Sequence, residues 1–385
     1  MSVTSSTARR LLEHTGQHPV VSLYLDLDPS QFATAPARAT QMRSLLDEAE
    51  RNGHGMTASM SHADRTALDA DLQRLEDYLG SDELPVSGAG ALAVFCSGQD
   101  DLFEAVALAD PTPPRAVIAT SPFVEPLVSG PDEGQAAVVL ISRRLGRILI
   151  GDPHDLREAE DVADRVHGKH SRGGWSQANY ERSIDNDAEQ HFRHVAEELY
   201  HGWQREPFER LVLGGPVEDV KRFAEDLHND LRRLLLDERL DLDVEVARLA
   251  DVGAALAPLL ERARAAGKAA ALEELENRLG AGGAAARGLA PTLEALNERR
   301  VQTLLLALNF SAPGTRCPRC GLLYPAQTGT CPADGEAVVE VADLREAAVE
   351  AAVLQDAGVM VIGEGTDPEP PALHRGGGIA ALLRF

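Results

Sequence analysis

The chain has no apolar run long enough to cross a membrane, and its opening stretch, MSVTSSTARRLLEHTG, has none long enough for a signal peptide. Cysteine is scarce: there are four, and three of them, Cys317, Cys320 and Cys331, lie within 15 positions. This distribution argues against a disulfide framework and for a reducing compartment. We therefore expect a cytoplasmic protein without a membrane partner.

Basic residues are outnumbered, with 37 Lys and Arg against 61 Asp and Glu and a net charge of −24. Such acidity disfavours non-specific binding to phosphate backbones. Salt screens charge effects beyond about 8–10 Å, so a local basic contact is still allowed. Basic residues do gather around the Gly-rich stretch KHSRGGWSQANYER, residues 169–182: they are Lys169, His170, Arg172, Arg182 and, further on, Arg193.

A length of 385 residues predicts two or three domains. Strands alternate with helices in three blocks, which predicts an α/β layer structure. The domains that we expect are residues 1–130, 131–256 and 257–385. A Pro-rich stretch, residues 111–134, is interpreted as a linker between the first two.

Within these blocks the residue pattern predicts several elements. The expected strands are 19–29, 90–98, 102–110, 209–216 and 301–310, with a pair of strands in 135–152. The expected helices are 38–52, 63–79, 255–279 and 344–358, with a long one starting near Ser176.

The Gly-rich loop has features of a catalytic loop. Consecutive glycines, Gly173 and Gly174, allow the chain to approach a ligand closely. The Gln177 side chain can orient a water molecule without ionising, and its backbone N–H, near a helix start, can stabilise an oxyanion. On the loop alone, a plain linker that contains Gly and Gln is the simpler interpretation.

The cysteines near the C-terminus form a zinc-like pattern. Cys317 and Cys320 make one Cys-x-x-Cys knuckle, and Cys331 opens a second in which Asp334 replaces the last thiolate. Three thiolates and a carboxylate can bind zinc tetrahedrally, although the set is uncommon. The two interpretations, a structural zinc site and a metal-free knuckle, both remain open.

The loop and the helix after it resemble the central domain of the archaeo-eukaryotic release factor and Pelota family, in which a Lys-Lys-His-Gly-Arg-Gly-Gly-Gln-Ser loop precedes a long basic helix. GLAPTLEALNERRVQTLLLALNF is similar to the C-terminal helix and strand of that family, GGGIAALLRF to its closing segment and VVSLYLDLDP to its opening strand. These segments occur in the family's order. By position, Gly173 and Gly174 match its glycines, Gln177 its glutamine and Arg172 the preceding basic residue. Trp175 and Ser176 are inserted, as in the Gly-x-Ser-Gln form of the ribosome-quality-control branch.

The resemblance implies a three-domain α/β protein. Its central domain is expected to be RNase H-like and to carry the catalytic loop. Its C-terminal domain is expected to resemble the kink-turn-binding ribosomal protein fold, with a small Cys-rich insertion at 317–334.

The implied activity is hydrolysis of the peptidyl-tRNA ester in the peptidyl-transferase centre, without a catalytic cofactor. The implied partners are the ribosome and peptidyl-tRNA, with a translational GTPase as a candidate for delivery. The residues expected to contact tRNA or ribosomal RNA are Lys169, His170, Arg172, Trp175, Ser176, Arg182 and Arg193.

The first block argues against stop-codon recognition. The family reads stop codons with an Asn-Ile-Lys-Ser loop, and this chain has no lysine before Lys169. We therefore expect a codon-independent rescue factor. Two alternatives remain: a non-catalytic ribosome-binding factor of hibernation or stress, and a nuclease that cuts the tRNA acceptor end with Gln177 near a 2′-hydroxyl.

Overall fold

The computed structural model describes residues 3–13, 18–27, 35–52, 60–81, 89–108, 112–129, 135–153, 155–163, 177–326, 329–363 and 371–385. The chain separates into two compact units. The first consists of Val3–Asp132 and Ala266–Phe385, and the second of Glu133–Ala265. No helix in the described ranges is both long enough and apolar enough to cross a membrane.

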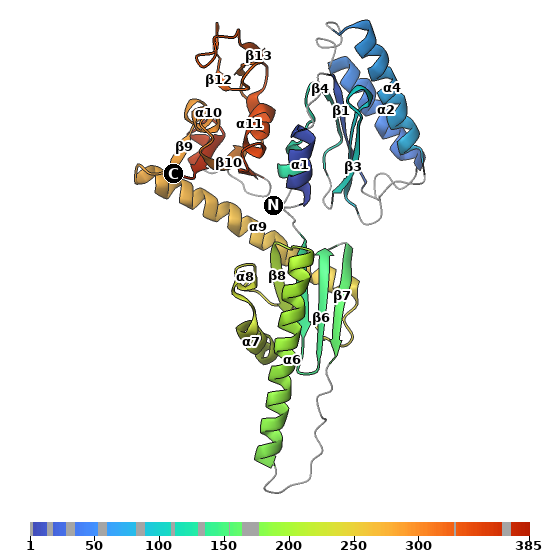
Figure 1. Cartoon of the computed structure of the whole chain (residues 1–385), viewed down its shortest axis with the longest axis vertical. Coiled ribbons are helices and arrows are strands. Elements are labelled where there is room, and N and C mark those ends of the chain that lie inside the picture. Colours follow the sequence, from blue (N-terminus) through green and yellow to red (C-terminus); the bar gives the residue numbers. More distant parts are fainter. Residues whose placement is uncertain are drawn as a thin grey trace. The chain divides into compact units, whose positions relative to one another are not determined.

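Both units are α/β, which confirms the predicted fold class (Figure 1). The division into three domains stays a prediction, as do the finer resemblances to RNase H-like and kink-turn-binding folds.

The N-terminal part of the first unit is an antiparallel sheet with the order β3-β2-β1-β4. Its elements are α1 (Val3–Glu13), β1 (Val20–Asp26), α2 (Ala35–Asn52), α4 (His62–Leu79), β2 (Ala91–Ser97), a 3₁₀ turn (Gly98–Asp100), β3 (Leu102–Leu108), β4 (Arg115–Ala119) and α5 (Glu125–Ser129). Alternate residues of a strand face opposite sides of a sheet. Val21 and Leu23 pack with α2 and α4, whereas Val20 and Tyr24 belong to a second core. Both faces of this sheet are therefore buried.

The linker prediction for residues 111–134 is wrong in part, because β4 and α5 lie within it. β4 pairs antiparallel with β1 and forms one edge of the sheet. An edge strand tolerates neighbouring prolines, since no ladder hydrogen bond is lost on its outer side. Pro113 and Pro114 therefore precede β4 without preventing it.

The C-terminal part of the first unit has a sheet with the order β14-β10-β15-β9 and, between β10 and α11, a small antiparallel sheet with the order β12-β11-β13. The elements are β9 (Ala285–Arg287), α10 (Leu289–Asn297), β10 (Val301–Ala307), β11 (Gly314–Arg316), β12 (Leu323–Pro325), β13 (Val339–Val341), α11 (Leu344–Val353), β14 (Gly358–Ile362), α12 (Pro371–His374) and β15 (Ile379–Leu383). The predicted Cys-rich insertion, residues 317–334, lies between β11 and β13 of this small sheet.

The second unit has a sheet with the order β7-β6-β5-β8. The elements are β5 (Ala136–Ile141), β6 (Leu145–Asp152), β7 (Asp155–Ala163), α6 (Gln177–Arg205), β8 (Arg210–Gly214), α7 (Val217–Asp226) and α8 (Asn229–Arg232). Every residue of β5 is buried. Val139 and its neighbours on one face pack with α6 and α7, and Val138 on the other face packs with the first half of α9 (Leu249–Gly280). The unit thus has three layers, helix, sheet and helix.

Helix α9 supplies residues to a core in each unit. Val252 and Leu256 in its first half belong to the core of the second unit. Leu275 in its second half packs with residues of β10, β14 and β15 in the first unit. This one helix is therefore the covalent connection from the second unit back to the first.

Candidate functional site

The predicted catalytic loop joins β7 to α6 in the second unit. Residues 164–176 lie outside the described residues, and with them the predicted site residues Lys169, His170, Arg172, Gly173, Gly174, Trp175 and Ser176. The backbone is described again from Gln177, which is the first residue of α6. The side chains of Gln177 and Arg182 also lie outside the described part. The roles assigned to these residues stay predictions.

Helix α6 is held to the sheet by an apolar face. Ala188, Phe192, Val195 and Leu199 are all at most 1% exposed and pack on residues of β5 and β6. The contact requires a glycine at Gly146, because a Cβ there would lie 2.5 Å from Cγ2 of Val195. The N-terminal part of α6 extends beyond the sheet, as Figure 1 shows. The sheet therefore fixes the direction of a helix whose first residue is Gln177.

Arg193, a predicted RNA contact, is paired with acids inside the second unit. Its guanidinium lies 3.7 Å from Glu189 of the same helix and 3.8 Å from Asp226 at the end of α7. Burial raises the pKa of Asp226, while Arg193 acts in the opposite direction. Phosphate binding by Arg193 would have to compete with these two carboxylates.

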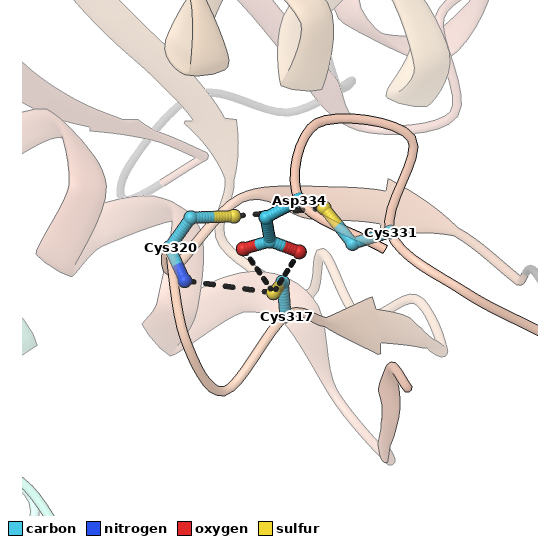
Figure 2. A group of neighbouring side chains, drawn as sticks. All are labelled: Cys317, Cys320, Cys331 and Asp334. Carbon is cyan, nitrogen blue, oxygen red and sulfur yellow. Dashed lines mark hydrogen bonds between the residues drawn. The ribbon is translucent and has the colours of Figure 1, made fainter. Parts of the chain in front are cut away.

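The cysteine cluster is the best-defined candidate site among the described residues. One ligand atom from each of Cys317, Cys320, Cys331 and Asp334 lies within 4.8 Å of the others. The sulfur atoms of Cys320 and Cys331 are 3.6 Å apart. Figure 2 shows the Asp334 carboxylate directed at Cys317, whose Sγ lies 3.4 Å from Oδ2.

The two knuckles have the same backbone geometry. In the first, the N–H of Gly321 donates to the carbonyl of Cys317, and in the second the N–H of Gly335 donates to that of Cys331, each at 2.9 Å. Gly321 and Gly335 have φ values of +75° and +76°, a region that favours glycine. Asp334 thus occupies in the second knuckle the place that Cys320 has in the first.

These donors fit a structural divalent metal ion. Cys317 and Cys331 are buried, whereas Cys320 is exposed. A hydrogen bond from the Tyr324 hydroxyl, 3.2 Å from the sulfur, lowers the pKa of Cys331. The backbone N–H of Glu336 lowers the pKa of Asp334 to about 2. Closed sets of four thiolate, imidazole or carboxylate ligands are typical of structural zinc.

Tyr324 could not be predicted from the sequence, because its role depends on strand pairing. Tyr324 lies opposite Thr315 in the pairing of β12 with β11, and this register brings its hydroxyl to Cys331. The small sheet is also fixed to α10, since the Asn297 side chain donates to the carbonyl of Leu323 at 2.7 Å and accepts its N–H at 2.9 Å. The four candidate metal ligands therefore belong to a small sheet that is hydrogen-bonded to α10.

Several solved structures are similar to this chain at low identity. An archaeal translation termination factor is 19% identical, with 100% of this chain and 99% of that one covered and a TM-score of 0.25. Pelota of Archaeoglobus fulgidus is 15% identical over 77% of this chain and 79% of its own, with a TM-score of 0.34. Dom34 of S. cerevisiae is 10% identical over 77% and 79%, with a TM-score of 0.42.

No curated protein matches the chain. Residues 122–271 match the model of Bacterial archaeo-eukaryotic release factor family 10. The matched segment contains β5 to β8, α6 and the loop before it. This segment is therefore similar to the release factors, in agreement with the resemblance of the loop and the helix after it to the archaeo-eukaryotic release factor and Pelota family.

Proposed function

We propose that this protein is a codon-independent ribosome rescue factor that hydrolyses the peptidyl-tRNA ester through the loop containing Gly173, Gly174 and Gln177. The observation that carries the proposal is the match of residues 122–271 to a release-factor family, because this segment encloses the loop. In the rest of the chain, the absence of lysine before Lys169 supports independence from the stop codon.

The position of Gln177 at the start of α6 suits the chemistry. The first four N–H groups of a helix lack acceptors within the helix, and the helix dipole favours negative charge at this end. The backbone N–H of Gln177 can therefore donate to the oxyanion that forms when water attacks an ester carbonyl. The Gln177 side chain would orient that water, and the two glycines would let the loop enter a crowded centre.

The insertion of Trp175 and Ser176 before Gln177 makes the position of Gln177 the most demanding condition for the proposed hydrolysis. Catalysis of this kind depends on positioning, and a misplacement of about 1 Å can cost about 100-fold in rate. The loop must therefore fold so that the insertion leaves Gln177 where a directly adjacent glutamine would be. If it does not, binding to the ribosome without hydrolysis is the expected function.

The proposed partners are the ribosome and peptidyl-tRNA, with a translational GTPase for delivery. Lys169, His170, Arg172 and Arg182 are the proposed phosphate contacts, and Arg193, paired with Glu189 and Asp226, would contribute less. Among similar proteins, an archaeal Pelota is described as ribosome-bound and Dom34 as interacting with Hbs1.

We also propose that the cysteine cluster binds a zinc ion and that the role of this ion is structural. Cys317, Cys320, Cys331 and Asp334 would hold it. When bound, the ion would neutralise the ligand charges and cross-link the two knuckles of the small sheet. The proposed hydrolysis does not involve this site.

The test is peptide release from purified ribosomes that hold labelled peptidyl-tRNA and have an empty A site. We expect Gln177→Ala, and the double change of Gly173 and Gly174 to Ala, each to lower the release rate by about 100-fold. Gln190→Ala and Gly202→Ala are matched controls on α6. Gln190 is exposed, and a Cβ at Gly202 would have no atom within 4 Å.

The alternatives give different results in the same experiment. Tight binding without release would overturn the hydrolase proposal and favour a non-catalytic ribosome-binding factor. Release of a tRNA that has lost its terminal nucleotides would identify a nuclease. Equal loss in the control variants would show a folding defect of α6 instead of a catalytic role for the loop.

A further inference from the structure

A buried cluster of charged side chains joins the N-terminal sheet of the first unit to α11. Arg345 of α11 and Glu125 of α5 form an ion pair at 2.7 Å, and each side chain is 13% exposed. Glu350, one helical turn further along α11, accepts a hydrogen bond from the Ser121 hydroxyl. The other Glu350 oxygen lies 2.7 Å from Arg316 at the end of β11. The two parts of the unit are thus connected by polar contacts that are largely out of water.

Glu346 lies within this cluster without a full set of partners. Its Oε1 is buried and has no hydrogen-bond partner among the described residues. Burial, followed by the charges of Glu350 and Glu125, raises the pKa of Glu346 to about 8, while Arg115 and Arg316 act in the opposite direction. At neutral pH the group is therefore protonated and uncharged.

Most charged groups on the neighbouring elements have partners of their own or lie in the solvent. Burial and the charges of Glu346 and Glu125 raise the pKa of Tyr24 on β1, whose hydroxyl donates to the carbonyl of Phe123 at 2.5 Å. Glu294 of α10 is exposed, and β10 and β14 carry no titratable residue. The ion pairs of α1 are Arg9 with Glu13 and Asp356, and Arg10 with Glu104. Arg115 of β4 has its guanidinium over the Phe123 ring, 5.2 Å from the ring centroid, and would attract an ionised Glu346, but Oε1 of Glu346 has no hydrogen-bond donor among the described residues.

We propose that this junction is a latch between the N-terminal sheet and α11, closed while Glu346 carries a proton and released when the proton is lost. An ionised Glu346 would be the third carboxylate in a buried cluster and would lack a donor for Oε1. Burying a charge without a partner is costly, and separating the two surfaces returns the carboxylate to water. Because α1 and α5 both contact α11 across the junction, they would lose this contact together. The inference does not depend on the proposed function.

The direction of the pH effect follows from proton linkage. In the open junction Glu346 regains its ordinary pKa of 4.5, whereas in the closed junction its pKa is about 8. Between these values the closed state binds one proton more than the open state. The closed junction therefore loses stability as the pH rises through this window, by up to about tenfold in the opening constant per pH unit. The effect levels off above the closed-state pKa.

The test is hydrogen exchange of the full-length protein from about pH 6 to pH 9, with the amides of α1 and α5 as reporters. The comparison is with Glu346→Gln, which keeps the shape of the protonated carboxyl and cannot ionise. The intrinsic exchange rate of each amide is the same in both proteins at each pH. The ratio of the observed exchange rates in wild type and variant therefore reports the opening of the junction. We expect the ratio of wild type to variant to rise by up to about tenfold per pH unit and then level off.

Two controls keep the test decisive. Glu294→Gln, the same change at an exposed position of α10, should behave as wild type. A second comparison uses the wild-type protein alone. The ratio of amide exchange rates in α1 and α5 to those in α4, which packs on the other face of the sheet, also reports the opening of the junction. A ratio that stays flat with pH would overturn the latch. An equal rise in the β10 amides would also overturn it, because the whole unit would then be unfolding.

Discussion

At the scale of single residues, two glycines of α9 have opposite roles that their sequence context does not reveal. A Cβ at Gly253 would lie 2.0 Å from the carbonyl oxygen of Pro153, in the turn between β6 and β7. A Cβ at Gly267 would have no atom within 4 Å. The first glycine therefore permits a close helix-to-turn contact, and the second only weakens the helix.

We expect Gly253→Ala to lower the free energy of unfolding of the second unit by about 1–3 kcal/mol, because the backbone carbonyl of Pro153 must move. Gly267→Ala is the matched control on the same helix, and it should stabilise the protein by up to about 1 kcal/mol through helix propensity. Urea denaturation followed by circular dichroism measures both. Equal effects of the two changes would show that the contact with Pro153 does not constrain the helix.

At the scale of elements, the small sheet of β11, β12 and β13 is the part of the molecule that the proposed metal ion would stabilise. Its strands have three residues each, and a structure of this size rarely holds together without a cross-link. Zinc held by Cys317, Cys320, Cys331 and Asp334 would supply that cross-link.

We expect one zinc ion per chain in the protein purified without added metal, and a clear loss of zinc in Cys331→Ser, because a serine hydroxyl is a poor ligand in place of a thiolate. Cys96→Ser is the matched control. Cys96 is buried in β2 beside Asp71 and is not part of the cluster. Metal analysis by mass spectrometry is the measurement. Zinc-free wild-type protein with an intact small sheet would favour the metal-free knuckle.

The elements that were predicted correctly are those with a strong local pattern. β5 is a continuous apolar run, and the predicted pair of strands in 135–152 is present as β5 and β6. The long helix predicted to start near Ser176 is present as α6, whose buried residues recur at helical spacing. β7 was missed, because its sequence DLREAEDVA is rich in charge and its place depends on pairing with β6. Edge strands often carry charged residues, so their sequence lacks the apolar pattern that predicts a strand.

The candidate sites also differ in whether their residues are close together in the sequence. The cysteine knuckles are local in sequence, so their spacing was enough to group Cys317, Cys320, Cys331 and Asp334. The cluster around Glu346 unites β4, α5, β11 and α11, which are far apart in the chain. Such a cluster depends on tertiary packing, and no periodicity in the sequence indicates it.

At the scale of the whole molecule, the question is which parts can fold alone. Both cores of the second unit draw all their residues from Glu133–Ala265. In the first unit, Leu11, Phe123 and Leu127 from the N-terminal part share one core with Leu344 and Ala348 of α11. The two ends of the chain therefore depend on each other for burial of apolar surface.

We expect a fragment of residues 133–265 to unfold cooperatively on heating, since its cores are complete. A fragment of residues 1–132 should melt at a lower temperature than the same segment in the full chain, because the surface that meets α11 would be exposed to water. Thermal denaturation of both fragments, beside the full chain, is the measurement. An N-terminal fragment as stable as in the full chain would instead support three independent domains, and the junction around Glu346 would then add little to the stability of the first unit.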